Sequence, residues 1–339
     1  ATVNTNILLL SKALNDKQKC KAVSCQNYKI DDIKNLSDFV QLHQVDCLFP
    51  SVDSWVILSS LEQSIKNKIE AVGTPLREWD INIYRGVLTG YNDAFIIDSA
   101  KREEILLNCK TEEERLRTTE LIRPILRGRD IKRYSYDWAE LWLIATFPSK
   151  HYDIEQYPSI KEYLMSIGTE KLEQSGAKYL INGVEVKSRK KTNNKWYETQ
   201  DNIGYWDDFN KPKIVYAELA RTGNAFTLDM NNQMISNTSY MITFDKNDND
   251  ECRLYCLLGF LNSLATLFYL DVSCSRFDEN GWRWLRQYVE NIPIPQIISI
   301  ELYNEVANAL KTPTDDIIKK INNLIFAIIG LDLGEINYL

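Results

Sequence analysis

The spacing of apolar residues changes at Ile292-Pro293-Ile294-Pro295, and this change limits the folds that the chain can adopt. Before it, from about residue 74, apolar residues occur in short strand-like runs that glycines interrupt. After it, apolar residues recur at helical spacing, which predicts one helix over 299–310 and a second from Thr314 to Gly330. Because only a short turn with a proline separates these two helices, we expect an antiparallel hairpin.

Apolar patterns also predict elements in the rest of the chain. A short helix is expected around 38–43, and longer helices over 60–72, 103–122, 158–168 and 253–270. Strands are expected over 5–12, 19–23, 141–145, 213–217, 226–228 and 239–244.

The composition is that of a globular protein, with 339 residues, 44% apolar and 26% charged. This size allows two domains or one large one. No apolar stretch is long enough to cross a membrane, no signal peptide is present, and the seven cysteines form no CxxC pair. We therefore expect a cytoplasmic protein with free buried thiols and no membrane partner. Because the chain does not start with Met, we expect a fragment of a longer protein.

Positive charge is concentrated in two segments, although the formal net charge is −7. The negative sum argues weakly against nucleic acid as a partner, but phosphate contacts need only a local basic face. Segment 121–134 contains one acid and five cations: Arg123, Arg127, Arg129, Lys132 and Arg133. On a loop or strand edge these cations suit phosphates or guanine. The alternatives are a solvated surface or pairing with the acids of 112–114.

The second basic segment, 187–196, has five cations and no acid, and its polar character predicts a flexible surface loop that orders on a duplex. The alternative is a loop that serves only solubility. A weaker candidate is the mixture of arginines and aromatic residues at 275–277 and 282–286, where packing of the tryptophans is the alternative.

Motifs of common enzymes are absent from the sequence. It has no G-x-G-x-x-G, Walker A, H-E-x-x-H or G-x-S-x-G segment. Glu185-Val186-Lys187 has the form of half a nuclease metal site, but no Pro-Asp precedes it. A zinc site at Cys20 with Cys25, or at Cys252 with Cys256, is only weakly suggested. The spacing of these cysteines is loose, and the chain has only two histidines to add as ligands.

Several segments occur in the order found in type IIG restriction-modification enzymes. Residues 83–98, IYRGVLTGYNDAFIID, resemble the family segment RG-x-x-TG-x-N-x-AF-x-ID, and residues 122–134, IRPILRGRDIKRY, resemble I-x-P-x-LRGRDIKRY. Weaker matches follow at Trp142-Leu143-Ile144, Tyr157-Pro158-Ser159-Ile160, Trp196-Tyr197, Lys211-Pro212-Lys213-Ile214, Leu261-Asn262-Ser263 and Ile292-Pro293-Ile294-Pro295. Residues 74–295 thus resemble the TaqI-like C-terminal specificity domain of these enzymes.

This resemblance implies an α+β fold: an irregular β-rich DNA-methylase specificity domain followed by the C-terminal antiparallel helical hairpin. Residues 1–45 would be a remnant of the last strands of a methyltransferase domain, and 46–73 a helical linker. Residues 74–295 would be the target recognition domain, and 296–339 the helical hairpin.

The resemblance also implies recognition of double-stranded DNA for an adenine-N6 methyltransferase, with restriction activity in some members. Nothing in this chain matches the Asn-Pro-Pro-Tyr catalytic loop of the family. We therefore expect this chain to be non-catalytic and to bind no cofactor. Its expected partner, besides DNA, is a methyltransferase domain of the same polypeptide. The parent enzyme would use S-adenosylmethionine, and Mg²⁺ for cleavage. The expected DNA contacts are Arg85, Thr89, Asn92, Arg127, Arg129, Lys132, Arg133, Lys187, Arg189, Lys190, Lys191 and Lys195. Gly90 is expected to let the backbone approach the duplex closely, with a plain hairpin turn as the alternative.

Three other functions remain open at the level of sequence. A type I restriction specificity subunit would usually carry two recognition domains in tandem, whereas one is found here. A metal-dependent nuclease would act on DNA by itself. A protein-interaction module would use the abundant tryptophans and tyrosines without binding DNA.

Overall fold

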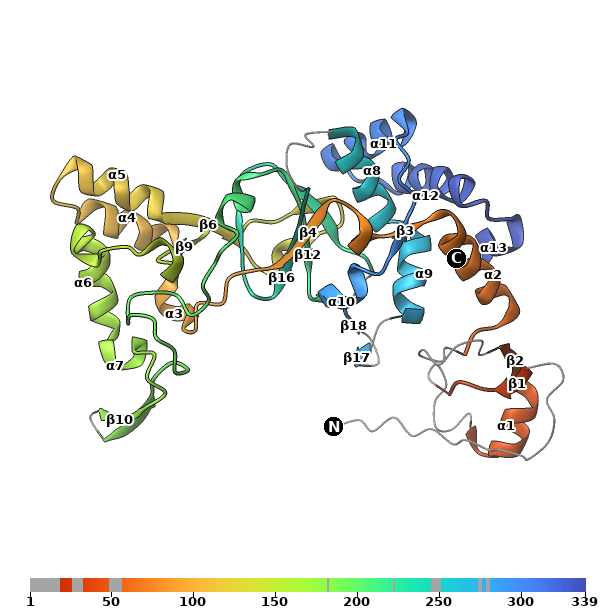
Figure 1. Cartoon of the computed structure of the whole chain (residues 1–339), viewed down its shortest axis with the longest axis horizontal. Helices are drawn as coiled ribbons and strands as arrows, with labels where there is room; N and C mark the ends of the chain where they lie inside the picture. Colours follow the sequence, from red (N-terminus) through yellow and green to blue (C-terminus); the bar gives the residue numbers. More distant parts are fainter. Residues whose placement is uncertain are drawn as a thin grey trace. The chain divides into compact units, whose positions relative to one another are not determined.

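The computed structural model describes residues 19–25, 33–48, 57–181, 183–221, 223–244, 251–273, 276–278 and 281–339 (Figure 1). The strand expected over 5–12 lies outside these residues. The chain divides into two compact units. One contains the described residues up to Lys68 together with Leu331–Tyr338, and the other contains Ile69–Gly330.

The smaller unit combines a two-stranded ribbon with helices. Strand β1 (Lys19–Ala22) pairs antiparallel with β2 (Val45–Leu48), and α1 (Leu36–His43) lies between them in the sequence. Helix α2 (Ser60–Val72), most of which belongs to this unit, has the predicted bounds. The short C-terminal helix α13 (Leu333–Tyr338) was not predicted.

Glu335 joins α13 to α2 within the smaller unit. Its side chain is 1% exposed. Its two carboxylate oxygens accept hydrogen bonds from the Ser64 hydroxyl and the Lys68 ammonium, both at 2.6 Å. Burial opposes ionisation of this carboxyl, but these bonds outweigh burial and lower its pKa to about 2.

The larger unit is built around an antiparallel sheet in the order β14-β12-β16-β4. Its strands are β14 (Phe226–Asp229), β12 (Lys213–Ala217), β16 (Ser239–Phe244) and β4 (Ile81–Arg85). Every side chain of β12, β14 and β16 is buried, which matches their apolar runs. A charged pair lies inside the sheet: Lys213 of β12 and Asp229 of β14 are fully buried, with N and O 2.5 Å apart.

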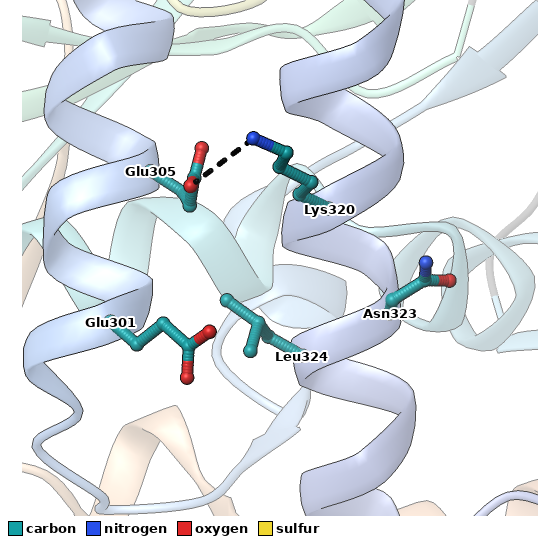
Figure 2. Close-up of a pocket in the computed structure, with 5 residues that line it drawn as sticks. All are labelled: Glu301, Glu305, Lys320, Asn323 and Leu324. Atoms are coloured by element: carbon teal, nitrogen blue, oxygen red, sulfur yellow. Dashed lines mark ion pairs between the residues drawn. The ribbon is translucent and has the colours of Figure 1, made fainter.

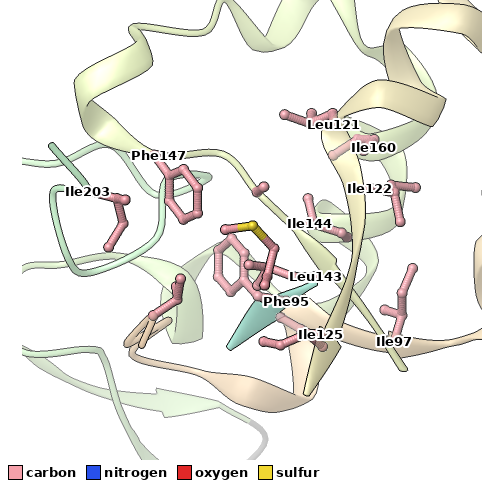
Figure 3. Packing of buried hydrophobic residues seen from close by; sticks show 14 of the residues in the cluster. Phe95, Ile97, Leu121, Ile122, Ile125, Leu143, Ile144, Phe147, Ile160 and Ile203 are labelled. Atoms are coloured by element: carbon pink, nitrogen blue, oxygen red, sulfur yellow. The ribbon is translucent and has the colours of Figure 1, made fainter. Parts of the chain in front are cut away.

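A second sheet has the order β15-β6-β9-β5. Strand β15 (Met234–Ile235) runs parallel to β6 (Ile122–Leu126), whereas β9 (Leu141–Ile144) is antiparallel to both β6 and β5 (Ile96–Asp98). Figure 3 shows the core that these strands share with neighbouring helices and loops. Its buried side chains include Phe95, Leu121, Ile122, Ile125, Leu143, Ile144, Phe147, Ile160 and Ile203.

Helices cover this second sheet at one end of the larger unit (Figure 1). They are α3 (Asn92–Phe95), α4 (Ser99–Leu107), α5 (Glu112–Leu121), α6 (Pro158–Ile167) and α7 (Thr169–Leu172). The single helix expected over 103–122 is therefore wrong. The chain breaks after Asn108, and α5 starts again where the Thr111 side chain accepts a hydrogen bond from the Glu114 N–H at 3.1 Å.

The long helix expected over 253–270 is also two helices, α8 (Glu251–Leu261) and α9 (Leu264–Ser273). The break at Asn262 and Ser263 is held by tertiary hydrogen bonds. The Asn262 side chain bonds both the N–H and the C=O of Phe226, at 3.1 and 2.9 Å. The Asn322 side chain accepts from the Leu264 N–H at 2.8 Å. The side chain at the break is thus tied to strand β14, and the Asn322 side chain takes the Leu264 N–H that a continuous helix would use.

The predicted C-terminal hairpin is present as α11 (Ile300–Lys311) and α12 (Asp315–Ile329). Thr314 caps α12, and Gly330 ends it with φ of +75°. Figure 2 shows the two helices side by side around a hollow, where Glu305 and Lys320 face each other at 3.8 Å. The chain is thus α+β, with helices following a β-rich body.

Short ribbons complete the larger unit. Strand β3 (Thr74–Pro75) pairs with β19 (Pro293–Ile294), so the two ends of the segment 74–295 meet. Strand β13 (Leu219–Ala220) pairs with β18 (Gly281–Arg283), which pairs with β17 (Arg276–Asp278). Two hairpins are β7 (Ile131–Lys132) with β8 (Ser135–Tyr136), and β10 (Lys178–Ile181) with β11 (Val184–Lys187).

Among the described helices, no single one is long and apolar enough to cross a membrane. The pair α8 and α9, bent by 59°, passes that test only when both are taken together. Of the six cysteines in the described ranges, none forms a disulfide, and only Cys47 and Cys256 are buried.

Candidate nucleic-acid interface

Arg189, expected on the surface, is instead a buried anchor. It is 4% exposed. Its guanidinium donates hydrogen bonds of 2.7 to 2.9 Å to the main-chain oxygens of Thr89, Leu172, Trp196 and Glu198. Burial lowers the pKa of Arg189 to about 10, but carbonyl oxygens accept from four of its five N–H donors. The prediction of a surface cation at this position is therefore wrong, because its N–H groups are used inside the protein.

The other cations of the basic loop, which we define as residues 187–195, are exposed. They are Lys187, Lys190, Lys191 and Lys195. Side-chain hydrogen bonds connect the backbone of this loop to neighbouring segments. Thr192 donates to the Gln174 side chain at 2.7 Å, and the Asn194 amide donates to the main-chain oxygen of Gln200 at 2.9 Å. The loop thus presents its lysines from a backbone that hydrogen bonds hold to Gln174 and Gln200.

The turn at 88–92 packs against the basic loop. Gly90 has φ of +78°, and a Cβ atom there would lie 2.7 Å from the Gln200 side-chain oxygen and 3.0 Å from Cδ of Arg189. The glycine therefore allows close packing against Gln200 and Arg189, where we had expected close approach to a duplex. Thr89 is fully buried and donates to the Asn92 side chain at 2.7 Å. Only Asn92, of the two predicted contacts in this turn, is exposed.

Two of the cations in segment 127–133 are held by other groups of the protein, and the other two are exposed. Arg127 forms an ion pair with Asp130 at 2.7 Å, whose hydrogen bond raises the pKa of Arg127. Arg133 is half-buried, and its guanidinium donates to the main-chain oxygen of Asn262. Desolvation lowers the pKa of Arg133. Arg129 and Lys132 are exposed, so these two are the best placed of the four to meet a phosphate.

Arg85 is the exposed last residue of β4, the strand at one edge of the central sheet. Its Nη2 donates to Oε2 of Glu218 at 2.9 Å, and its Nε donates to the main-chain oxygen of Asn237 at 3.0 Å. Glu218 also pairs with Arg283 at 2.8 Å. The side chain of Thr238, which follows Asn237 in the chain, accepts a hydrogen bond from the Gly128 N–H at 3.0 Å. The segment that starts at Arg127 therefore lies next to the residues that hold Arg85.

Asp201 connects the surroundings of Arg85 with the basic loop. Burial raises the pKa of its carboxyl, while the Leu88 N–H and the charges of Arg85 and Lys190 act in the opposite direction. Its own N–H donates to the Leu88 oxygen at 3.2 Å. Arg85, the 88–92 turn and Lys190 thus lie around one half-buried carboxyl.

A tyrosine pair supports the same region. The rings of Tyr84 and Tyr205 stack with centroids 4.2 Å apart. The Tyr205 hydroxyl donates to the main-chain oxygen of Arg85 at 2.6 Å. Burial, with the charge of Asp201, raises the pKa of Tyr205 to about 12. The hydroxyl therefore stays protonated, and it fixes the backbone that carries Arg85.

The structure thus brings together three of the predicted elements: Arg85, the 88–92 turn and the basic loop. Glu218 was not among the predicted site residues, whereas its partner Arg283 lies in the 282–286 segment that the sequence offered as a weaker candidate. Glu218 follows the all-buried strand β12, and a single acid directly after an apolar run is the signal that was available. Its arginine partners could not be inferred, because they are distant in sequence.

Residues 123–294 match the sequence model of the TaqI-like C-terminal specificity domain. The chain belongs to this family. The basic loop and segment 127–133 lie within the matched residues of the TaqI-like domain, and Arg85 and the 88–92 turn precede them. No curated protein matches the sequence at a significant level.

Two restriction enzymes are among the solved structures similar to this TaqI-like chain. The Type IIL restriction-modification enzyme MmeI, solved in complex with DNA, has a TM-score of 0.51 and 12% identity over 86% of this chain and 37% of MmeI. The type IIG restriction endonuclease BpuSI has a TM-score of 0.44 and 13% identity over 75% of this chain and 28% of BpuSI. The chain therefore spans 37% of the length of MmeI and 28% of the length of BpuSI.

Proposed function

We propose that this chain recognises a specific sequence of double-stranded DNA for an adenine-N6 methyltransferase of the type IIG restriction-modification class. In this proposal the chain itself transfers no methyl group and cleaves no DNA. The observation that carries the proposal is the specificity-domain match over residues 123–294, which contains most of the exposed cations described above. MmeI, which shares the fold, was solved with DNA bound.

The arrangement of charge supports a division between positioning and reading. Lys190, Lys191 and Arg129 are exposed on ordered backbone and suit phosphates, whose contacts fix register without reading sequence. Base edges would be read by side chains that the fold holds in place. A local basic surface of this kind attracts DNA in spite of the net charge of −7.

The proposal assigns the methyl donor S-adenosylmethionine, and Mg²⁺ for any cleavage, to a methyltransferase domain and its parent enzyme rather than to residues 1–339. The sequence of this chain contains no Asn-Pro-Pro-Tyr loop for a flipped adenine. Within the described ranges no group of three or more His, Cys, Asp or Glu side chains is arranged to hold a metal ion.

Binding is tested by selecting duplexes from a library with a randomised centre on the purified chain and sequencing the bound fraction. Enrichment of one sequence over the input is the expected result. Equal recovery of all sequences would show that the chain does not recognise a target. The log of the binding constant should also fall linearly with the log of salt concentration.

The non-catalytic part of the proposal has its own test. The chain is incubated with labelled S-adenosylmethionine and mixed-sequence duplex, and separately with plasmid and Mg²⁺. We expect neither labelled DNA nor nicked plasmid. Sequence-specific incorporation of label would contradict the proposal, and metal-dependent cleavage would favour a nuclease.

A further inference from the structure

One carboxylate joins two arginines that lie on strands far apart in the sequence. Oε2 of Glu218 accepts a hydrogen bond from Nη2 of Arg85 at 2.9 Å. Oε1 of the same carboxylate accepts from Nε of Arg283 at 2.9 Å, and Nη2 of Arg283 lies 2.8 Å from that oxygen. Each carboxylate oxygen thus holds one guanidinium.

The carboxylate is fixed, whereas both arginines face solvent. The side chain of Glu218 is 8% exposed, but those of Arg85 and Arg283 are 53% and 48% exposed. The backbone of Glu218 is held on both sides, because its N–H donates to the Thr238 oxygen at 2.9 Å and its oxygen accepts from the Trp284 N–H at 2.8 Å. The acid is therefore a rigid support for two half-exposed cations.

Each guanidinium keeps an outer edge for a further partner. A guanidinium carries five N–H donors in one plane. Arg85 uses Nε for the Asn237 oxygen and Nη2 for Glu218. Arg283 directs Nε and Nη2 at Glu218. Within the described part of the chain, Nη1 of neither arginine donates a hydrogen bond. Because Nε and Nη2 of Arg283 both face the carboxylate, its terminal edge of Nη1 and Nη2 stays available, and Arg85 keeps Nη1 for a further acceptor.

This edge has the donor pattern that guanine accepts. Guanine presents O6 and N7 side by side in the major groove, and a guanidinium pairs with both at once. An arginine whose side chain is already held loses less conformational freedom on binding than a mobile one.

We infer that Arg85 and Arg283 read guanine bases in the major groove and that Glu218 is the positioning residue for both. This inference rests on the proposed function, recognition of double-stranded DNA. It adds the base that is read and the residues that read it. The trio carries a net charge of +1, so it also attracts the duplex without depending on the basic loop.

The test compares base preferences, using the selected duplex sequence as probe. Arg85→Lys and Arg283→Lys keep the charge but lose the bidentate edge. Each should reduce discrimination for guanine at one position by on the order of 10-fold or more, with little change in salt dependence. Glu218→Gln should weaken discrimination at both positions, because the neutral amide loses the negative charge that holds both guanidiniums and leaves one accepting oxygen for two arginines. Arg115→Lys, an exposed arginine on α5, is the matched control and should change nothing.

A second measurement uses the wild-type chain, so it does not depend on how the variants fold. Duplexes in which 7-deazaguanine replaces one guanine at a time lack N7. Binding should weaken at the positions assigned to Arg85 and Arg283, and the lysine variants should show a smaller further loss on these duplexes. Unchanged guanine preference in all variants, with a sequence-specific wild type, would overturn the inference and leave the proposed function intact. A wild type without sequence preference would instead overturn the proposed function.

Discussion

The guanidinium of Arg189 donates a hydrogen bond of 2.9 Å to the main-chain oxygen of Thr89, which lies 100 residues earlier in the chain. The bond joins the 88–92 turn to the basic loop. A cation in the middle of a lysine-rich segment therefore holds the surface together from inside, while its neighbours face solvent.

Replacing Arg189 should destabilise the fold. Arg189→Met leaves four buried carbonyl oxygens without their donor, and we expect a loss of about 2–4 kcal/mol in the free energy of unfolding. Urea unfolding followed by circular dichroism measures it. The neighbouring exposed residue provides the control, since Lys190→Met should change stability by less than about 0.5 kcal/mol. Equal effects of the two substitutions would contradict the anchoring role.

Lys190 and Lys191 should act on DNA affinity alone. The double variant Lys190→Ala with Lys191→Ala removes two candidate phosphate contacts. It should lower the slope of log affinity against log salt by about 2 in magnitude, with unchanged sequence preference. Fluorescence anisotropy at several salt concentrations measures the slope. The adjacent exposed lysines Lys319 and Lys320 of α12 form a matched control pair, whose replacement by alanine should leave the slope as it is.

Replacing Gly90 by a larger residue should lower the stability of the fold. Gly90→Ala places a Cβ at φ of +78° and 2.7 Å from the Gln200 side-chain oxygen. We expect a loss of about 1–2 kcal/mol in stability, from backbone strain and crowding together. Gly204→Ala is the control, because nothing lies within 4 Å of its Cβ position. The midpoint of thermal unfolding is measured for both variants. Equal midpoints would show that the turn can accommodate a Cβ atom at residue 90.

Glu335 should make stability depend on acid pH. Its pKa is lowered from 4.5 to about 2 in the folded protein by its bonds to Lys68 and Ser64, against the effect of burial. The stabilisation is therefore complete above pH 4.5 and is lost as the pH falls towards 2. Glu335→Gln should cost about 1–2 kcal/mol at neutral pH, and the difference from wild type should shrink on acidification. A difference that stays constant from pH 7 to pH 3 would contradict this assignment.

The helices and central strands could be predicted because their patterns are local. The bounds of α2 and of the hairpin helices α11 and α12 follow from apolar spacing, a capping Thr314 and Gly330. The breaks within 103–122 and 253–270 could not be predicted. In the second case the side chains of Asn262 and Asn322 end and restart the helix through bonds to distant backbone.

The candidate site shows the same limit. Its basic segments are visible in the sequence, but burial of one member is not. Lys190 and Arg189 have the same local context, and only the carbonyl oxygens contributed by other segments distinguish them. The trio around Glu218 likewise depends on the pairing of β13 with β18, which no local pattern encodes.

All four acceptors of Arg189 are main-chain oxygens, and every amino acid supplies such an oxygen. The hydrogen bonds of the anchor therefore do not depend on which side chains the four acceptor residues carry. Positions such as Lys187, Lys190 and Lys191 can change identity while the backbone keeps its course. A library randomised at these exposed positions, with Arg189 retained, is thus a rational starting point for selecting altered DNA preference on an unaltered scaffold.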